Sequence, residues 1–164
     1  MIDTHCHLTF PEFRGREGAV MDAARAVGVR GAITISTTSE DCVRALEVAH
    51  RVAGVWCSSG VHPLYSDQGP HDWGAIERVA RDARCVAWGE LGLDNHYAEP
   101  AKAIQLATLA EQLEVIGRVN REIGKPVIIH CREAFDELIP ILRESGLPAE
   151  RFVFHCFTAG EREA

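Results

Sequence analysis

The sequence contains no uninterrupted apolar run that approaches the roughly 20 residues needed to span a membrane. It opens without the basic segment and apolar stretch of a secretory leader. We therefore expect a cytoplasmic protein with no membrane contact. It also has no internal repeat, low-complexity tract or Pro- and Gly-rich linker, so residues 1–164 are expected to form a single domain.

Basic residues are in short supply, because 17 Lys and Arg stand against 24 Asp and Glu and the net charge is −7. This balance argues against an extended electrostatic interface with nucleic acid, which normally needs a basic face. A phosphodiester substrate is still compatible with it, because bound divalent cations would reverse the local charge of a site.

The six cysteines are widely spaced and contain no CxxC pair, which argues against a secreted disulfide framework. Three of them, Cys6, Cys131 and Cys156, directly follow a histidine. Neighbouring side chains in a strand point to opposite faces, so we expect these three thiols to pack in the core as small hydrophobes.

Short β-branched segments alternate with longer segments of helical periodicity, which predicts a parallel sheet built from βαβ units. The strand candidates are residues 1–4, 31–36, 55–60, 86–91, 126–130 and 152–155. The helix candidates are residues 18–27, 40–52, 73–83, 101–123 and 135–144. Pro140 lies inside the last of these, where it is expected to remove a backbone hydrogen bond or kink the helix.

Nearly every strand candidate ends in a chemically active side chain, and this decides between an open sheet and a barrel. The groups are His5 and His7, residues 36–38, His62, Glu90 and Asp94, His130, and His155. Side chains from the carboxyl ends of many strands converge in a barrel, whereas an open sheet brings together only those beside its switch point. We therefore predict an α/β fold, a TIM-like (β/α)8 barrel. Because such barrels typically need about 250 residues, we expect six βα units here and the last two missing.

The His5-Cys6-His7 motif is the strongest indication of a metal site. Residues i and i+2 of a strand share a face, so both imidazoles point toward one position. Imidazole suits zinc-like divalent metals, whereas a carboxylate such as Glu90 has two oxygens and can span two ions. We expect a site for a divalent metal, Zn²⁺, Mn²⁺ or Mg²⁺.

Taken together, His5-Cys6-His7, Gly60-Val61-His62-Pro63, the segment 89–94 (GELGLD), the segment 126–132 (PVIIHCR) and His155-Cys156-Phe157 resemble the TatD family of metal-dependent hydrolases. The resemblance runs from residue 2 to about residue 160, with the motifs in family order. It implies two divalent metal ions: His5 and His7 bind the first, Glu90 bridges both, and His130 and His155 bind the second. It also implies a final aspartate ligand in a Thr-Asp motif, for which this sequence has no corresponding segment.

Several polar residues near these motifs are candidates for catalysis or substrate binding. Asp94 could orient a ligand histidine or accept a proton, or it could cap a helix. His62 is assigned to substrate phosphate or to support of a ligand. Arg132 shares a face with His130 and suits a phosphate oxygen, its alternative being an ion pair with an acidic neighbour. His96, in a His-Tyr pair resembling one in the family, is expected to line the substrate cleft.

The resemblance implies a phosphodiesterase, most simply a TatD-type deoxyribonuclease acting as a 3′-exonuclease on DNA. One alternative keeps the two metals but cleaves an ester or amide, as in a D-aminoacyl-tRNA deacylase. The other is an inactive metal-binding fragment of a longer barrel. We expect no obligate protein partner, although the unclosed edges of the barrel could support self-association.

Overall fold

We describe a computed structural model, in which residues 1–161 are placed. Strands and helices alternate along the chain as the sequence predicts. The strands are β1 (Ile2–Cys6), β2 (Gly31–Thr34), β3 (Val55–Ser59), β4 (Cys85–Asp94), β5 (Val127–Arg132) and β6 (Phe152–Phe154). The α-helices are α1 (Glu17–Ala26), α2 (Ser39–Arg51), α3 (Trp73–Arg81), α4 (Lys102–Ile123) and α5 (Phe135–Glu144), with short 3₁₀ turns at Pro11–Phe13 (η1), Pro63–Tyr65 (η2) and Ala149–Arg151 (η3).

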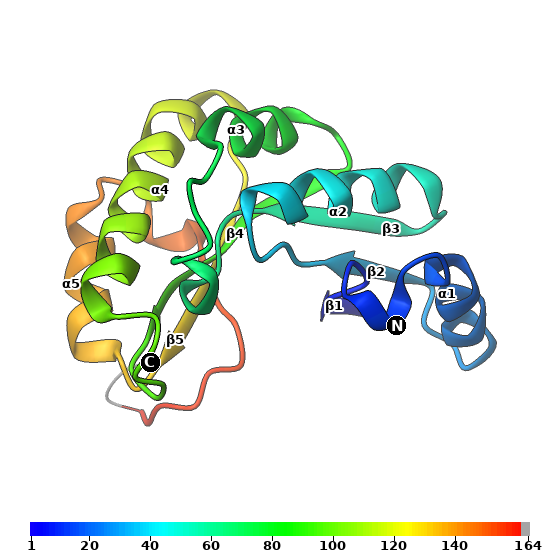
Figure 1. The fold of residues 1–164 in the computed structure, drawn as a ribbon, viewed down its shortest axis with the longest axis horizontal. Coiled ribbons are helices and arrows are strands. Elements are labelled where there is room, and N and C mark those ends of the chain that lie inside the picture. Colours follow the sequence, from blue (N-terminus) through cyan, green and yellow to red (C-terminus); the bar gives the residue numbers. More distant parts are fainter. Residues whose placement is uncertain (162–164) are drawn as a thin grey trace.

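The six strands form one parallel sheet in the order of the chain, from β1 at one edge to β6 at the other. The sheet curls around an interior, and the helices lie on its outer side (Figure 1). This is a half-barrel, so the predicted barrel architecture with six βα units is confirmed. All six carboxyl ends lie at one rim, and the candidate site is there.

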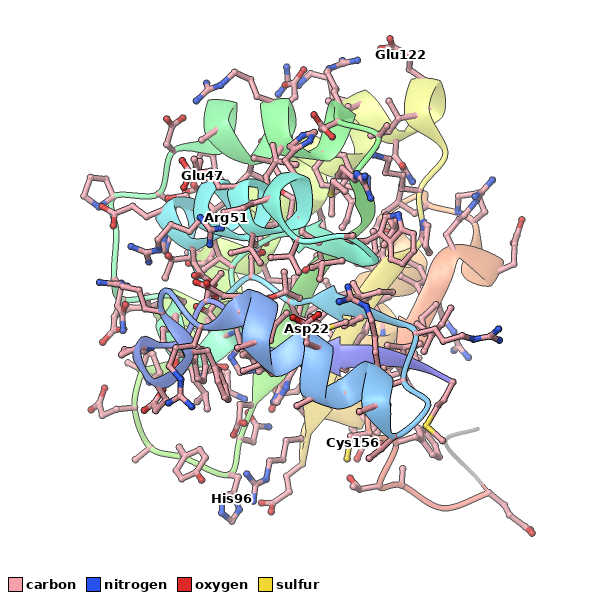
Figure 2. All side chains as sticks on the ribbon, turned by 90° about the vertical axis from the view of Figure 1, so that its right-hand side faces the viewer. Asp22, Glu47, Arg51, His96, Glu122 and Cys156 are labelled. Atoms are coloured by element: carbon pink, nitrogen blue, oxygen red, sulfur yellow. The ribbon has the colours of Figure 1, made fainter. Side chains whose placement is uncertain are left out.

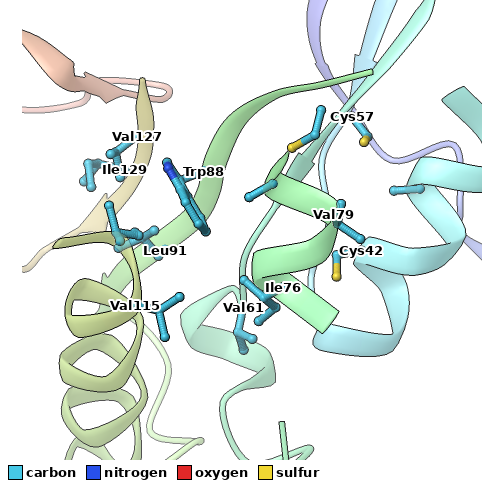
Figure 3. Close-up of a cluster of buried hydrophobic side chains, with 14 of the residues drawn as sticks. Cys42, Cys57, Val61, Ile76, Val79, Trp88, Leu91, Val115, Val127 and Ile129 are labelled. Atoms are coloured by element: carbon cyan, nitrogen blue, oxygen red, sulfur yellow. The ribbon is translucent and has the colours of Figure 1, made fainter. Parts of the chain in front are cut away.

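Two layers of apolar side chains cover the two faces of the sheet. The outer layer lies between strands and helices and is centred on Trp88 and Leu91 of β4 (Figure 3). The inner layer is much smaller and consists of Ile35, Ala87 and Ile128, with Ile33 packed against them. The alternation of strand side chains thus divides the sequence's apolar residues between the two faces.

The helix boundaries follow local signals in the sequence. Thr38 caps α2 by accepting a hydrogen bond from the Asp41 N–H, and Asp72 caps α3 in the same way. The helix α4 ends at Gly124, whose φ of 62° is the left-handed conformation of a C-terminal cap. The helix α5 extends across Pro140 without interruption, so the proline does not end it.

The edges of the sheet are partly exposed. Ile2 in β1 and Val153 in β6 are each about half exposed, at 55% and 51%. The thiols of Cys6 and Cys131 do pack toward the strand–helix layer as expected, but Cys156 is exposed. That prediction was wrong because β6 already ends at Phe154, and strand alternation no longer turns Cys156 inward. Among the described residues, no helix is both long and apolar enough to cross a membrane.

Candidate metal centre

Glu90 lies at the centre of the candidate site, on β4, with 1% of its surface exposed. Its two carboxylate oxygens face different histidines. Oε2 lies 3.1 Å from Nε2 of His5, and Oε1 lies 2.8 Å from Nδ1 of His130. Burial works to raise the pKa of Glu90, but the hydrogen bonds from His130 and His5 outweigh it and hold the carboxyl well below its usual pKa. The group is therefore a carboxylate in a nearly dry environment.

Two groups of potential metal ligands share this carboxylate. The first contains His5, His7 and Glu90, and the second contains His62, Glu90 and His130. Within each group the donor atoms all lie within 4.8 Å of one another. A carboxylate shared between two sets of imidazoles is the arrangement that a pair of bridged divalent ions needs.

The ring of His7 is oriented by the backbone of β2's carboxyl end. Its Nδ1 donates a hydrogen bond of 3.0 Å to the Ile35 carbonyl, which leaves Nε2 with a free lone pair. Burial lowers the pKa of His7, so the ring is neutral and suited to bind a metal.

Asp94 orients His130 from the opposite side. Its Oδ2 accepts a hydrogen bond of 2.9 Å from Nε2 of His130, while its Oδ1 accepts from the backbone N–H groups of His96 and Tyr97. Since Nε2 is the donor, Nδ1 of a neutral His130 is an acceptor that faces the carboxylate of Glu90. Two acceptors 2.8 Å apart need a cation between them, either a proton or a metal ion. Burial works to lower the pKa of His130, but the carboxylates of Glu90 and Asp94 raise it. The raised pKa favours a proton between Nδ1 and Glu90 in the metal-free site, and an imidazole nitrogen facing a carboxylate oxygen is also a donor pair that fits a metal ion.

His62 is buried beside this pair, and its hydrogen bonds indicate a role other than metal ligation. Its Nδ1 accepts a hydrogen bond from the Leu64 N–H, and burial lowers its pKa to about 4, so the ring is neutral. A neutral imidazole with Nδ1 as acceptor carries its proton on Nε2. Its Nε2–H therefore points into the site, 3.1 Å from Nδ1 of His130 and 3.8 Å from Oε1 of Glu90.

Two glycines allow the strands to approach closely enough for these contacts. Gly92 has a φ of 146°, and a Cβ on it would lie 1.9 Å from the His130 carbonyl oxygen. A Cβ on Gly60 would lie 2.6 Å from the Cα of Gly89. Side chains at these positions would push β4 away from β5 and from the loop after β3.

The helix α4 holds two of the strand-end loops through buried glutamines. Gln112 accepts a 2.7 Å hydrogen bond from the Val61 N–H and donates a 3.0 Å bond to the Val61 carbonyl. Gln105 binds the backbone N–H and C=O of Asp94 and also the Pro100 carbonyl. The two residues are seven apart and so lie on one face of the helix. They fix the backbone next to His62 and at Asp94.

Each of the other predicted site residues contacts a different partner. His155 follows β6, and its ring stacks on that of His5 with 3.4 Å between centroids. Arg132 lies over the ring of Tyr97 at 5.3 Å. His96 pairs with Glu133 and projects outward at the rim (Figure 2). The structure thus brings His5, His7, His62, Glu90, Asp94 and His130 together, stacks His155 on His5 outside both ligand groups, and leaves Arg132 and His96 at the periphery.

Three residues of the site were not predicted from the sequence: Gln105, Gln112 and Phe10, whose ring stacks on His7 with 4.7 Å between centroids. A buried glutamine in an amphipathic helix gives no pattern that distinguishes it from a solvated one. For Phe10 a signal was present, because it follows His7 by three residues, just as Tyr65 follows His62.

The chain matches the family described as TatD related DNase over residues 2–164. The chain belongs to the TatD family. Among TatD relatives, it is 32% identical over 166 residues to the "3'-5' ssDNA/RNA exonuclease TatD" of Klebsiella pneumoniae (strain 342), covering 99% of this chain and 61% of the relative. It is 28% identical to the "uncharacterized metal-dependent hydrolase YabD" of Bacillus subtilis (strain 168), covering 100% of this chain and 63% of the relative.

The crystal structure of YjjV, a TatD homolog from Escherichia coli K12, superimposes with a TM-score of 0.86 at 32% identity. The alignment covers 100% of this chain and 62% of that one. A TatD family hydrolase structure from Entamoeba histolytica shares the fold, with a TM-score of 0.83 at 22% identity. The chain therefore spans about three fifths of the length of the TatD relatives that it matches.

Proposed function

We propose that this protein is a two-metal-dependent hydrolase of phosphodiester bonds that acts as a 3′-exonuclease on DNA. The observation that supports this most directly is the carboxylate of Glu90, whose oxygens face His5 on one side and His130 on the other. The relative named as a single-strand DNA and RNA exonuclease supports the choice of substrate.

In this proposal His5, His7 and Glu90 would hold one ion, and Glu90, His130 and His155 would hold the other. When bound, the ions would lower the pKa of a bound water toward neutrality and neutralise charge that develops on a phosphate. The nitrogen-rich donor set favours Zn²⁺ or Mn²⁺ over Mg²⁺.

The remaining side chains would position the ligands and the substrate. Asp94 holds His130 with Nδ1 facing Glu90, because it occupies Nε2. His62, with its proton on Nε2, would donate a hydrogen bond to a phosphate oxygen. Arg132 and His96, at the rim, would contact the substrate farther from the cleaved bond.

The first test compares substrates. A 3′-labelled single-stranded oligonucleotide and an aminoacyl ester are incubated with the protein at its natural length, with Mg²⁺ or Mn²⁺. We expect release of single nucleotides from the 3′ end. Cleavage of the ester alone would replace the nuclease proposal with a deacylase, and cleavage of neither would support the inactive fragment. Intact mass establishes the length of the protein tested.

The second test measures bound metal by elemental analysis. We expect Glu90→Ala to lose both ions and His155→Asn to lose mainly one. His62→Asn should keep both, because His62 is assigned as a donor. If His62→Asn loses one ion and His155→Asn loses none, then His62 is the metal ligand and His155 is not.

A further inference from the structure

Building on the proposed nuclease function, we propose that a cleft beside the metal centre binds the nucleobase adjacent to the cleaved phosphate, by stacking against Phe10 and Tyr65. The two rings come from the loops that follow β1 and β3. Both line one cavity of about 550 Å³, together with Thr37 and Thr38 after β2. This volume lies in the range of pockets that bury small organic ligands.

The cleft adjoins the candidate metal ligands through direct ring contacts. The ring of Phe10 lies parallel to that of His7, with 4.7 Å between centroids and 14° between planes. The ring of Tyr65 meets His62 edge-on at 5.9 Å. A base held by these rings would be one side chain away from the groups that contact the phosphate.

A backbone hydrogen bond to the histidine three residues earlier helps to place each ring. The Phe10 N–H donates to the His7 carbonyl at 3.2 Å, and the Tyr65 N–H donates to the His62 carbonyl at 2.9 Å. A proline stands in each short helical turn, Pro11 after Phe10 and Pro63 before Tyr65. Each ring is therefore fixed three residues after a site histidine, which limits the entropy lost when a ligand binds.

The charges around the cleft favour a base over a second phosphate. The lining includes the carboxylates Glu12, Glu40 and Asp41 against the guanidinium groups Arg14 and Arg44. Arg44 already lies 3.8 Å from Glu40 and 3.7 Å from Asp41. A phosphate would meet net negative charge here, whereas a neutral base would stack on the aromatic rings, as in proteins that bind single strands.

The experiment combines ring removal with base removal. Phe10→Leu and Tyr65→Leu are compared with Phe13→Leu, a matched control in the same turn as Pro11 whose side chain does not line the cleft. The substrates are a single-stranded oligonucleotide and two versions with an abasic residue, one at the 3′-terminal and one at the penultimate position.

We expect Phe10→Leu and Tyr65→Leu to lower kcat/KM on the normal oligonucleotide about 5- to 150-fold, mainly through KM, which is the range for one lost base–aromatic stack. Phe13→Leu should stay near the parent value. On one of the two abasic substrates, the cleft variants and the parent protein should have the same kcat/KM. The same defect on the normal and both abasic substrates would overturn the proposal, because the rings would then only support His7 and His62.

Binding of a fluorescein-labelled oligonucleotide in metal-free buffer separates this proposal from the nuclease function. Weaker binding by the two cleft variants than by Phe13→Leu supports the cleft even if the parent protein cleaves no DNA, an outcome that would refute only the nuclease function. Equal binding by all three variants and the parent would overturn the cleft proposal whether or not DNA is cleaved.

Discussion

Replacing Gln112 with leucine tests whether α4 holds the loop that carries His62. Leucine has a similar volume, so the substitution removes polar contacts and creates little cavity. It leaves the N–H and the C=O of Val61, a fully buried residue, without their partners. An unsatisfied buried group costs about 1–3 kcal/mol, so we expect the free energy of unfolding to fall by about 2–6 kcal/mol.

This loss corresponds to a melting temperature lower by roughly 5–20 °C for a chain of this size, measured by circular dichroism. Gln105→Leu should cost more, because Gln105 satisfies three backbone groups where Gln112 satisfies two. Gln68→Leu, on an exposed loop residue, is the control, with an expected change within about 0.5 kcal/mol. A Gln112→Leu protein that melts within about 2 °C of the parent would refute the reasoning.

Gly92→Ala should lower the free energy of unfolding by about 3 kcal/mol in urea titrations, the upper end of the usual cost of overpacking, since its Cβ would meet the His130 carbonyl oxygen at 1.9 Å. Its control is Gly117→Ala in α4, where an added Cβ would meet no atom within 4 Å outside its own helix, so stability should rise by about 0.5–1 kcal/mol, and equal effects would contradict the packing argument. Glu17→Gln should cost about 1–2 kcal/mol at pH 7, because Glu17 accepts hydrogen bonds and pairs with Arg51 at 3.1 Å. Burial works to raise the pKa of Glu17, but these partners lower it, so its contribution is present above about pH 4.3 and is lost at lower pH. The free energies of unfolding of Glu17→Gln and the parent protein should therefore converge below about pH 4. A difference that stays constant with pH would count against the ion pair.

Local patterns predicted much of the fold. The helix at 135–144 was predicted residue for residue, because its apolar spacing is regular. The strand β4 was predicted too short, as 86–91, whereas it extends from Cys85 to Asp94. Gly92 and Asp94 are typical of turns, and only the pairing of Gly92 with His130 and of Asp94 with Arg132 on β5 keeps this segment extended.

Part of the candidate site could likewise be predicted from the sequence, and part could not. The spacing of His5 and His7 and their position at a strand end are properties of the sequence, and so is the presence of Glu90, His130 and His155 at later strand ends. The role of His62 depends on which of its ring nitrogens accepts the hydrogen bond from the Leu64 N–H. The role of Asp94 depends on which ring nitrogen of His130 it binds. Contacts between segments far apart in the sequence decide which nitrogen is bound, and no local sequence pattern predicts those contacts.

The sequence by itself determined the alternation of strands and helices and the residue types available at each strand end, because both follow from periodicity and from side-chain chemistry along a short stretch of chain. Only the tertiary structure decided that the two oxygens of Glu90 face different histidines, and that Phe10 and Tyr65 line one cleft. The physical reason is the curl of the sheet, which brings strand ends far apart in sequence to one rim. There, Gly60 and Gly92 and the glutamines of α4 fix their distances.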